Sequence, residues 1–202
     1  MSAARLAALL LAAALAACGG GGAKLDKLPA DAVVLAFGDS LTYGTGAARE
    51  ESYPARLERA IGRKVVNAGV PGEASAQGLE RLAGALDETR PSLLILCHGG
   101  NDFLRKLDEA AAAGNVRAMI VLARDKGVPV VLLATPKPGL PPSVPPFYAE
   151  IAAELRVPYE EGVIRQVLLD NRLKSDLVHP NAQGYARIAE AVRELLDRAG
   201  AI

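Results

Sequence analysis

The chain has 202 residues, of which half are hydrophobic and only 4% aromatic, and its 23 basic residues equal its 23 acidic residues in number. This length suits one well-packed domain and is short for two. Lys and Arg form no cluster, which excludes the electrostatic footprint of a nucleic-acid-binding protein. Two His cannot form a three-His metal site, and no Cys/His spacing indicates a structural zinc site.

The first segment of the chain has the pattern of a signal peptide. Arg5 is the only early charge, and residues 6–17 are an unbroken run of Leu and Ala. This run is too short to span a bilayer but suits the apolar part of a signal peptide. It leads into Leu-Ala-Ala-Cys at residues 15–18, which resembles the lipobox of bacterial lipoproteins.

The lipobox resemblance implies a membrane-anchored protein. Residues 1–17 would be removed as a lipoprotein signal peptide, and the sulfur of Cys18 would carry the lipid. The protein is then expected in the bacterial cell envelope, facing the periplasm or at the outer membrane, and an ordinary secreted protein is the alternative. The glycines that follow Cys18 predict a flexible tether over residues 18–31, so that the folded domain spans residues 32–202.

From residue 33 onward, short apolar runs alternate with amphipathic helical patterns, which predicts a parallel sheet wound by crossover helices. The third apolar run, Leu93 to Cys97, is apolar throughout and is expected at the centre of the sheet, with Cys97 as a buried small hydrophobe. Six prolines in residues 136–146 predict a stiff irregular loop. Strands are predicted at residues 33–37, 64–67, 93–97, 130–134 and 157–159. One helix is predicted to start at the cap Ser52, a second at the cap Ser75, and a third to run from Asn115 to Gly127. Three more helices are predicted at residues 147–155, 163–169 and 181–198.

Four short motifs carry the residue types needed for chemistry. Three of them directly follow predicted strands, and the fourth precedes the last predicted helix. Because sites in such sheets form at the carboxyl ends of the strands, all four motifs can gather at one edge. The motifs are Gly38-Asp39-Ser40-Leu41, the turn around Gly72, Gly99-Gly100-Asn101-Asp102, and Asp176-Leu177-Val178-His179-Pro180.

These motifs contain the parts of a serine nucleophile system. The hydroxyl of Ser40 needs a base, and His179 is the best candidate. Asp176, three residues earlier, is suited to orient the imidazole. Acyl transfer also needs hydrogen-bond donors for an oxyanion, which the amides of Ser40 and Gly72 and the side chain of Asn101 can provide.

Other polar residues near these motifs are predicted to have structural roles. Asp39 and Asp102 are expected to accept hydrogen bonds from loop amides, although a carboxylate pair can also serve metal or acid/base chemistry. Tyr43 and Tyr185 are expected to be packing residues. His98 is expected to be a wall or hydrogen-bonding residue and not a second base.

The four motifs, in this order over residues 37–185, resemble the blocks of the SGNH hydrolases, also called the GDSL family, and among them the bacterial lysophospholipase, thioesterase and arylesterase branch. The resemblance implies a flavodoxin-like, three-layer α/β/α fold with a central parallel sheet of about five strands. His98 departs from this branch, which often has a small or acidic side chain there. The implied catalytic triad is Ser40, Asp176 and His179, and the implied oxyanion hole is Ser40, Gly72 and Asn101, with no metal and no organic cofactor.

The leading hypothesis is a lipid-anchored serine esterase that hydrolyses esters or thioesters of short to medium acyl chains through an acyl-enzyme on Ser40. A carbohydrate O-acetyl esterase is one alternative, although the scarcity of aromatic residues favours acyl chains over sugars. An alternative of another class is a lipid-anchored protein that binds acyl ligands without turning them over. The proline-rich loop 136–146 is predicted to border the acyl site, because it follows the fourth strand.

Overall fold

Five parallel strands form the centre of the molecule. The computed structural model describes residues 23–202, so the predicted signal peptide and the lipidation site Cys18 lie outside the described residues. The strands pair in the order β2-β1-β3-β4-β5, which confirms the prediction that residues 93–97 form the central strand. The strands are β1 (Val33–Gly38), β2 (Lys64–Gly69), β3 (Leu93–Cys97), β4 (Val130–Leu133) and β5 (Tyr159–Glu160).

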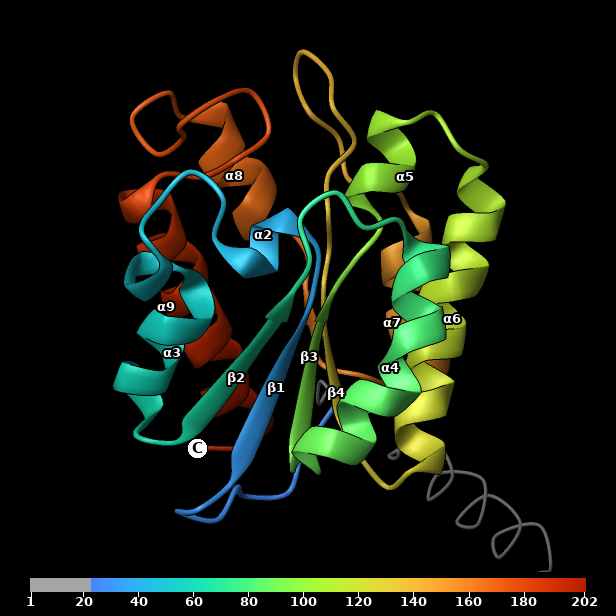
Figure 1. Ribbon diagram of the computed structural model, residues 1–202, viewed down its shortest axis with the longest axis vertical. Helices are drawn as coiled ribbons and strands as arrows, with labels where there is room; N and C mark the ends of the chain where they lie inside the picture. Colours follow the sequence, from blue (N-terminus) through green and yellow to red (C-terminus); the bar gives the residue numbers. More distant parts are fainter. Residues whose placement is uncertain (1–22) are drawn as a thin grey trace, which may run out of the picture.

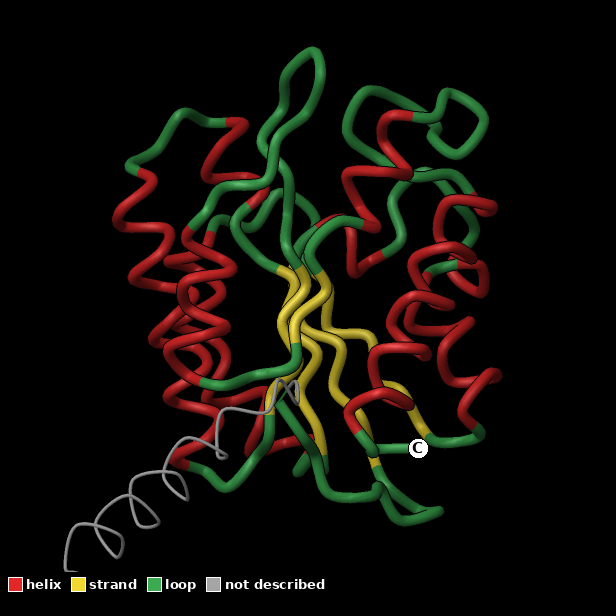
Figure 2. Tube along the Cα trace, turned by 180° about the vertical axis from the view of Figure 1, so that it is seen from behind, coloured by secondary structure: helices red, strands yellow, loops and turns green. Residues whose placement is uncertain are grey.

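Alternate residues of each strand face opposite layers of helices. In β1, Val34 belongs to one buried cluster and its neighbour Leu35 to the other, and β3 repeats the pattern with Ile95 and Leu96. This alternation follows from the two-residue period of a β-strand. Both faces of the sheet are therefore covered, as Figure 2 shows in a view in which the yellow strands lie between two layers of red helices.

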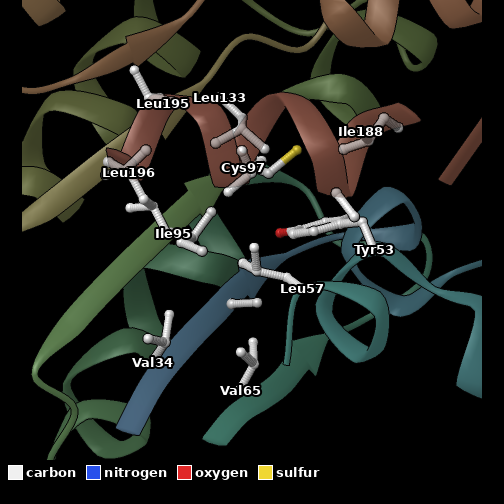
Figure 3. Packing of buried hydrophobic residues seen from close by; sticks show 14 of the residues in the cluster. Val34, Tyr53, Leu57, Val65, Ile95, Cys97, Leu133, Ile188, Leu195 and Leu196 are labelled. Atoms are coloured by element: carbon white, nitrogen blue, oxygen red, sulfur yellow. The ribbon is translucent and has the colours of Figure 1, made fainter. Parts of the chain in front are cut away.

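The first helical layer packs on the side that carries Ser40. Helices α3 and α9 make most of this contact, and Figure 3 shows Tyr53 and Leu57 of α3 and Leu196 of α9 gathered around Ile95 of β3 and Val34 of β1. The amphipathic pattern of α9, predicted from the sequence, supplies its buried face. The layer consists of α2 (Ser40–Tyr43), the short 3₁₀ helix η2 (Arg49–Glu51), α3 (Tyr53–Ile61), α8 (Val163–Leu169) and α9 (Ala182–Ala199).

The second layer covers the opposite face of the sheet and includes the helix that carries Asn101 (Figure 1). Met119 and Ile120 of α6 and Leu82 of α4 are fully buried against the strands. The layer consists of α4 (Ser75–Thr89), α5 (Gly100–Leu104), α6 (Glu109–Asp125) and α7 (Phe147–Leu155). Together with the first layer it gives the predicted three-layer α/β/α fold.

Several predicted boundaries are wrong for identifiable reasons. Helix α6 does not begin at Asn115 but at Glu109, because the side chain of Asp108 caps it by accepting from the amide of Ala110. The run of alanines that follows favours helix, and Asn115 lies inside the helix. The last strand occupies residues 159–160 and not 157–159.

Two predicted helix caps also differ from the structure. Ser75 is the first residue of α4 and not its cap, a position that Ala74 holds. Ser52 does hold the cap position of α3, but its hydroxyl donates to the carbonyl of Arg49 and does not accept from a helix amide. Serine hydroxyls have several local acceptors near a helix start, so a Ser at such a place indicates the boundary more reliably than the bond it makes.

The prediction of a flexible tether is wrong for its second half. The amides of Leu25 and Leu28 donate to the carbonyls of Ala199 and Ala201, at distances of 2.9 and 2.8 Å, and Leu28 is buried. Arg63 also donates to the carbonyl of Leu28. This part of the chain is therefore attached to the folded domain, beside the end of α9. Over residues 23–202, no helix combines the length and the apolar character needed to cross a membrane.

Candidate active site

Ser40 lies at the sharp turn between β1 and α2, at the carboxyl edge of the sheet. The turn requires glycine at position 38, since a Cβ there would lie 2.1 Å from the carbonyl oxygen of Cys97. Asp39 caps α2 by accepting from the amide of Leu41 at 3.0 Å. Burial raises the pKa of the Asp39 carboxyl above its usual value. The turn thus presents the Ser40 side chain to a cavity at the end of the sheet.

His179 is carried by the loop between α8 and α9, and that loop is held by its own hydrogen bonds. The amide of Ser175 donates to the carbonyl of His179 at 2.9 Å. Asn181 caps α9 by accepting from two amides of its first turn, as predicted for the start of this helix. Asp176 Oδ1 accepts from the amides of Val178 and His179, at 2.8 Å each. These bonds fix the imidazole relative to the start of α9.

The hydroxyl of Ser40, the imidazole of His179 and the carboxylate of Asp176 form a continuous hydrogen-bonded chain. Asp176 Oδ2 lies 2.8 Å from His179 Nδ1, and His179 Nε2 lies 3.0 Å from Ser40 Oγ. A carboxylate can only accept, so Nδ1 carries the proton and Nε2 is free to accept from the serine. The sequence analysis predicted that these three residues act together although Ser40 and His179 are 139 positions apart, and the structure places them in contact.

The surroundings of the Asp176 carboxyl favour its ionised form. Its partial burial opposes ionisation, but the hydrogen bonds from the His179 side chain and from the amides of Val178 and His179 outweigh this, and the pKa of Asp176 lies below its usual value. A charged acceptor at Nδ1 stabilises the imidazolium that forms when His179 takes a proton. The arrangement can therefore move a proton from Ser40 to His179 and support the resulting positive charge.

The three predicted oxyanion donors lie in different surroundings. Asn101, on α5, lines the same cavity as Ser40 and His179, and its Nδ2 donates one hydrogen to Asp39 Oδ2 at 3.2 Å. An amide nitrogen has two hydrogens, so one remains for a ligand. Gly72 has a φ of +78°, which glycine adopts without strain. The residue is partly exposed but is not among those that line the cavity. Within residues 23–202, the backbone amides of Ser40 and Gly72 have no hydrogen-bond acceptor.

Asp102 confirms the prediction of a structural carboxylate. Its two oxygens accept from the amide and the hydroxyl of Ser75, at 2.8 and 2.7 Å. Asn115 donates to the same hydroxyl at 2.9 Å. Asp39 likewise accepts from the amide of Leu41 and from the side chain of Asn101, so both carboxylates are held by hydrogen-bond donors. The sequence did not indicate the link between Ser75 and Asn115, because these residues lie on different helices.

One of the remaining predictions for single residues is wrong, because Tyr43, expected to be a packing residue, is 42% exposed. The others agree with the structure. Cys97 is a fully buried free thiol, and burial raises its pKa. Tyr185 is buried and donates to the carbonyl of Thr45 at 2.8 Å. His98 is fully buried and hydrogen-bonded, and it does not line the cavity. None of these residues lines the cavity beside Ser40.

A cavity of about 530 Å³ opens beside the Ser40–His179 pair. Residues 136–142 form one wall, which confirms that the proline-rich loop borders the site, and this loop projects beyond the ends of the strands in Figure 1. Leucines from α5, α8 and the His179 loop supply much of the remaining lining. No Phe, Tyr or Trp is among the described residues that line it. Its size and apolar character suit an acyl chain.

Within residues 23–202 there is no group of three or more His, Cys, Asp or Glu side chains that could hold a metal ion.

Residues 36–187 match the GDSL-like lipase/acylhydrolase family. The chain belongs to this family. It is an ester-hydrolysing serine hydrolase, and its five-stranded parallel sheet with flanking helices is the SGNH hydrolase fold.

Similar proteins support this assignment over most of the chain. The esterase TesA of Pseudomonas aeruginosa is 31% identical over 185 residues, which cover 83% of this chain and 89% of that protein. An arylesterase of Vibrio mimicus is 28% identical over 181 residues, with the same coverage of 83% and 89%. Among solved structures, TesA superposes with a TM-score of 0.74 at 27% identity, covering 83% of this chain and 99% of that one. The SGNH-hydrolase family esterase AlinE4 has a TM-score of 0.65 at 31% identity, covering 84% and 96%.

Proposed function

We propose that this family member hydrolyses esters and thioesters of short to medium acyl chains, with Ser40 as the nucleophile and the acyl chain in the apolar cavity. The observation that carries the proposal is the hydrogen-bonded chain from Asp176 through His179 to Ser40 at the mouth of that cavity. Nucleophile, base and orienting group lie at hydrogen-bond distances, as covalent catalysis by serine requires.

The reaction has two halves. His179 Nε2 takes the hydroxyl proton of Ser40 while Oγ bonds to the acyl carbon, and the carbonyl electrons move onto oxygen. The amides of Ser40 and Gly72 and the side chain of Asn101 donate to this oxyanion. The imidazolium then protonates the departing alkoxide or thiolate, which leaves an acyl-enzyme. Water then gives a proton to His179 while its oxygen bonds to the acyl carbon. The imidazolium protonates the departing Oγ, which releases the carboxylic acid and restores the Ser40 hydroxyl.

The composition of the cavity favours an acyl chain over a sugar. Carbohydrate sites commonly stack sugar rings on aromatic side chains, and the described lining has no Phe, Tyr or Trp. Leucine and proline side chains instead present apolar surface to the ligand. Each methylene buried there contributes about 0.8 kcal/mol, which corresponds to about a fourfold gain in kcat/KM per methylene while the chain still fits.

The test is turnover of a series of p-nitrophenyl esters from acetate to dodecanoate by the wild-type protein and by Ser40→Ala. The wild type should show a rise in kcat/KM over the first members and then a plateau or fall, and Ser40→Ala should lose several orders of magnitude. Equal rates for the two proteins would overturn the nucleophile. Acetate release from acetylated polysaccharide, with no turnover of longer esters, would instead favour the O-acetyl esterase. Failure of a fluorophosphonate probe to label Ser40 would favour an acyl-binding protein without turnover.

We further propose that Cys18 anchors the protein in the cell envelope and that the cavity opens away from the anchor. The support is the sequence around Cys18 and the path of the chain after residue 23. Lys24 donates to the carbonyl of Arg198 at the last turn of α9, whereas His179 precedes the first turn of that helix. A helix of 18 residues is about 27 Å long, so Lys24 and the cavity lie at opposite ends of it. Palmitate incorporation that is lost in Cys18→Ala would support the anchor, and equal incorporation would contradict it.

A further inference from the structure

A second buried polar chain, separate from the Ser40 system, lies between the ends of three strands. His98 Nε2 is 3.0 Å from Glu73 Oε2, and Glu73 Oε1 accepts from Arg81 Nε at 2.6 Å. His98 has no exposed surface, and Glu73 is 7% exposed. Burying charged and polar groups costs stability unless every partner is satisfied, so a chain of this kind calls for a physical explanation.

The protonation state of His98 follows from its neighbours. The amide of Gly99 donates to Nδ1 at 3.2 Å, so Nδ1 is an acceptor and has no proton. The proton of the neutral ring therefore sits on Nε2, from which it is donated to Glu73. One imidazole thus holds a backbone amide with one nitrogen and a carboxylate with the other.

The two groups held by His98 belong to the two loops that supply oxyanion donors. Gly99 lies two residues before Asn101, at the start of α5. Glu73 directly follows Gly72. The ring therefore bridges the loop after β3 and the loop after β2, and it sets how far apart they lie.

The ring itself has no freedom to move. A Cβ on Gly78 of α4 would lie 2.3 Å from His98 Nε2, so the imidazole packs directly against the helix backbone. Tyr148 donates to the carbonyl of His98 at 2.7 Å. Arg81 connects this hydrogen-bonded chain to the sheet. Its Nη2 donates to the carbonyl of Ala68 at 2.8 Å, and its guanidinium lies 3.9 Å from the centre of the Phe37 ring.

We propose that His98 is a positioning residue for catalysis, which through Glu73 and Gly99 sets the separation of the Gly72 amide and the Asn101 side chain. This inference rests on the proposed function, since it concerns the oxyanion that forms when Ser40 attacks. Such donors act only if they are fixed at the place where charge develops in the transition state. A displaced donor weakens binding of the transition state while leaving binding of the ground-state ester nearly unchanged.

The test replaces His98 by Leu, which fills a similar space but neither donates nor accepts. Removal of a whole oxyanion donor costs about 10²–10³-fold in kcat, so a displaced one is expected to cost about 10–100-fold. The expected result is that fall in kcat per active site, with KM changed by less than about threefold. Active sites are counted by fluorophosphonate titration, so that loss of folded protein is not read as loss of rate.

Two further variants keep the outcome interpretable. Glu73→Gln retains the shape of the side chain, but its NH₂ cannot accept, so the variant loses either the bond from Arg81 Nε or the bonds from His98 Nε2 and Arg81 Nη2. It should also lower kcat. The fold loss of kcat in the double variant should be much smaller than the product of the two single losses, because both substitutions act through one link. Met119→Ala, in the core of the same layer, serves as the control that lowers the thermal midpoint without lowering kcat.

The possible outcomes separate the inference from the proposed function. If Ser40→Ala is inactive and His98→Leu keeps wild-type kcat per site, the positioning role is wrong and the esterase stands. The role is also wrong if only KM rises, or if Met119→Ala lowers kcat as much as His98→Leu. If Ser40→Ala retains the wild-type rate, the proposed function itself has failed. If His98→Leu does not fold, the kcat of Glu73→Gln decides by the same criteria.

Discussion

Replacing Asp176 by Asn tests the proton geometry of the site with little change in shape. Asp176 Oδ1 accepts from the amides of Val178 and His179, at 2.8 Å each, and the Oδ1 of an asparagine can keep both bonds. In the wild type, Oδ2 lies 2.8 Å from His179 Nδ1, and in the variant the NH₂ group takes the place of Oδ2. An NH₂ group only donates, so Nδ1 becomes the acceptor and the ring proton moves to Nε2. Nε2 can then no longer take the proton of Ser40.

The expected loss follows from the wrong tautomer. In serine hydrolases with a buried carboxylate the same exchange lowers kcat about 10⁴-fold. Here the Asp176 side chain is 53% exposed, so water can take over part of its orienting role. We therefore expect a fall of about 10³-fold in kcat, which is about 4 kcal/mol in activation free energy. KM should change little, because Asp176 does not line the cavity.

The assay is steady-state hydrolysis of p-nitrophenyl butyrate, with the thermal midpoint measured on the same preparations. Asp176→Ala removes the acceptor for the two loop amides as well, so it should lower both kcat and the thermal midpoint, whereas Asp176→Asn should lower kcat alone. Asp125→Asn, at the exposed end of α6, is the matched control and should change neither. A kcat for Asp176→Asn within tenfold of the wild type, in a folded protein, would refute the reasoning.

Three further predictions concern the surroundings of the site. Gly78→Ala should destabilise the protein by about 1–3 kcal/mol in urea unfolding, because its Cβ would lie 2.3 Å from His98, whereas Gly84→Ala, with open space on the same helix, should stabilise it by up to about 1 kcal/mol. Burial opposes ionisation of Glu73, but hydrogen bonds from His98 and its arginine partner prevail and hold its pKa below the ordinary 4.5. The ionised Glu73 therefore contributes to the free energy of unfolding above pH 4.5, and this contribution is lost as the pH falls through the lowered pKa. The acid-induced decrease in the free energy of unfolding should be smaller in Glu73→Gln. Leu104→Ala, at a half-exposed position in the cavity lining, should lower kcat/KM about fivefold for hexanoate esters while sparing acetate esters.

Elements with strong local signals could be predicted from the sequence. β3 is apolar at every position, and its predicted bounds and central place agree with the structure. Helix α7 follows a pair of prolines and α8 follows a glycine, and both have the predicted bounds. Local chemistry fixed these ends, so no distant contact was needed to find them.

Other elements depend on contacts that the local sequence does not show. The first turns of α6 are almost all alanine, which favours helix but gives no hydrophobic period, so the predicted start fell too late. β5 has two residues, too few for any pattern, and forms because it pairs with Leu132 and Leu133. Leu25 and Leu28 look like part of a polar tether, and their hydrogen-bond partners at the C-terminal end of α9 lie more than 170 residues away in the sequence.

The residues of the candidate site also fall into two groups, those that the local sequence could predict and those that depend on distant contacts. Ser40, Asn101 and His179 lie in motifs whose residue types have a chemical meaning, and the topology of a parallel sheet predicts that such motifs share an edge. Glu73 and Arg81 belong to no such motif, and their pairing with His98 exists only because β1 lies between β2 and β3 and brings the ends of all three strands together. A group that reacts can therefore be recognised from its own chemistry, whereas a group that positions it can be recognised only from its neighbours. For this chain the difference is testable, because the two kinds of residue predict different kinetics: loss of Ser40 or His179 removes a step, and loss of His98 leaves every step in place but weakens the binding of one transition state.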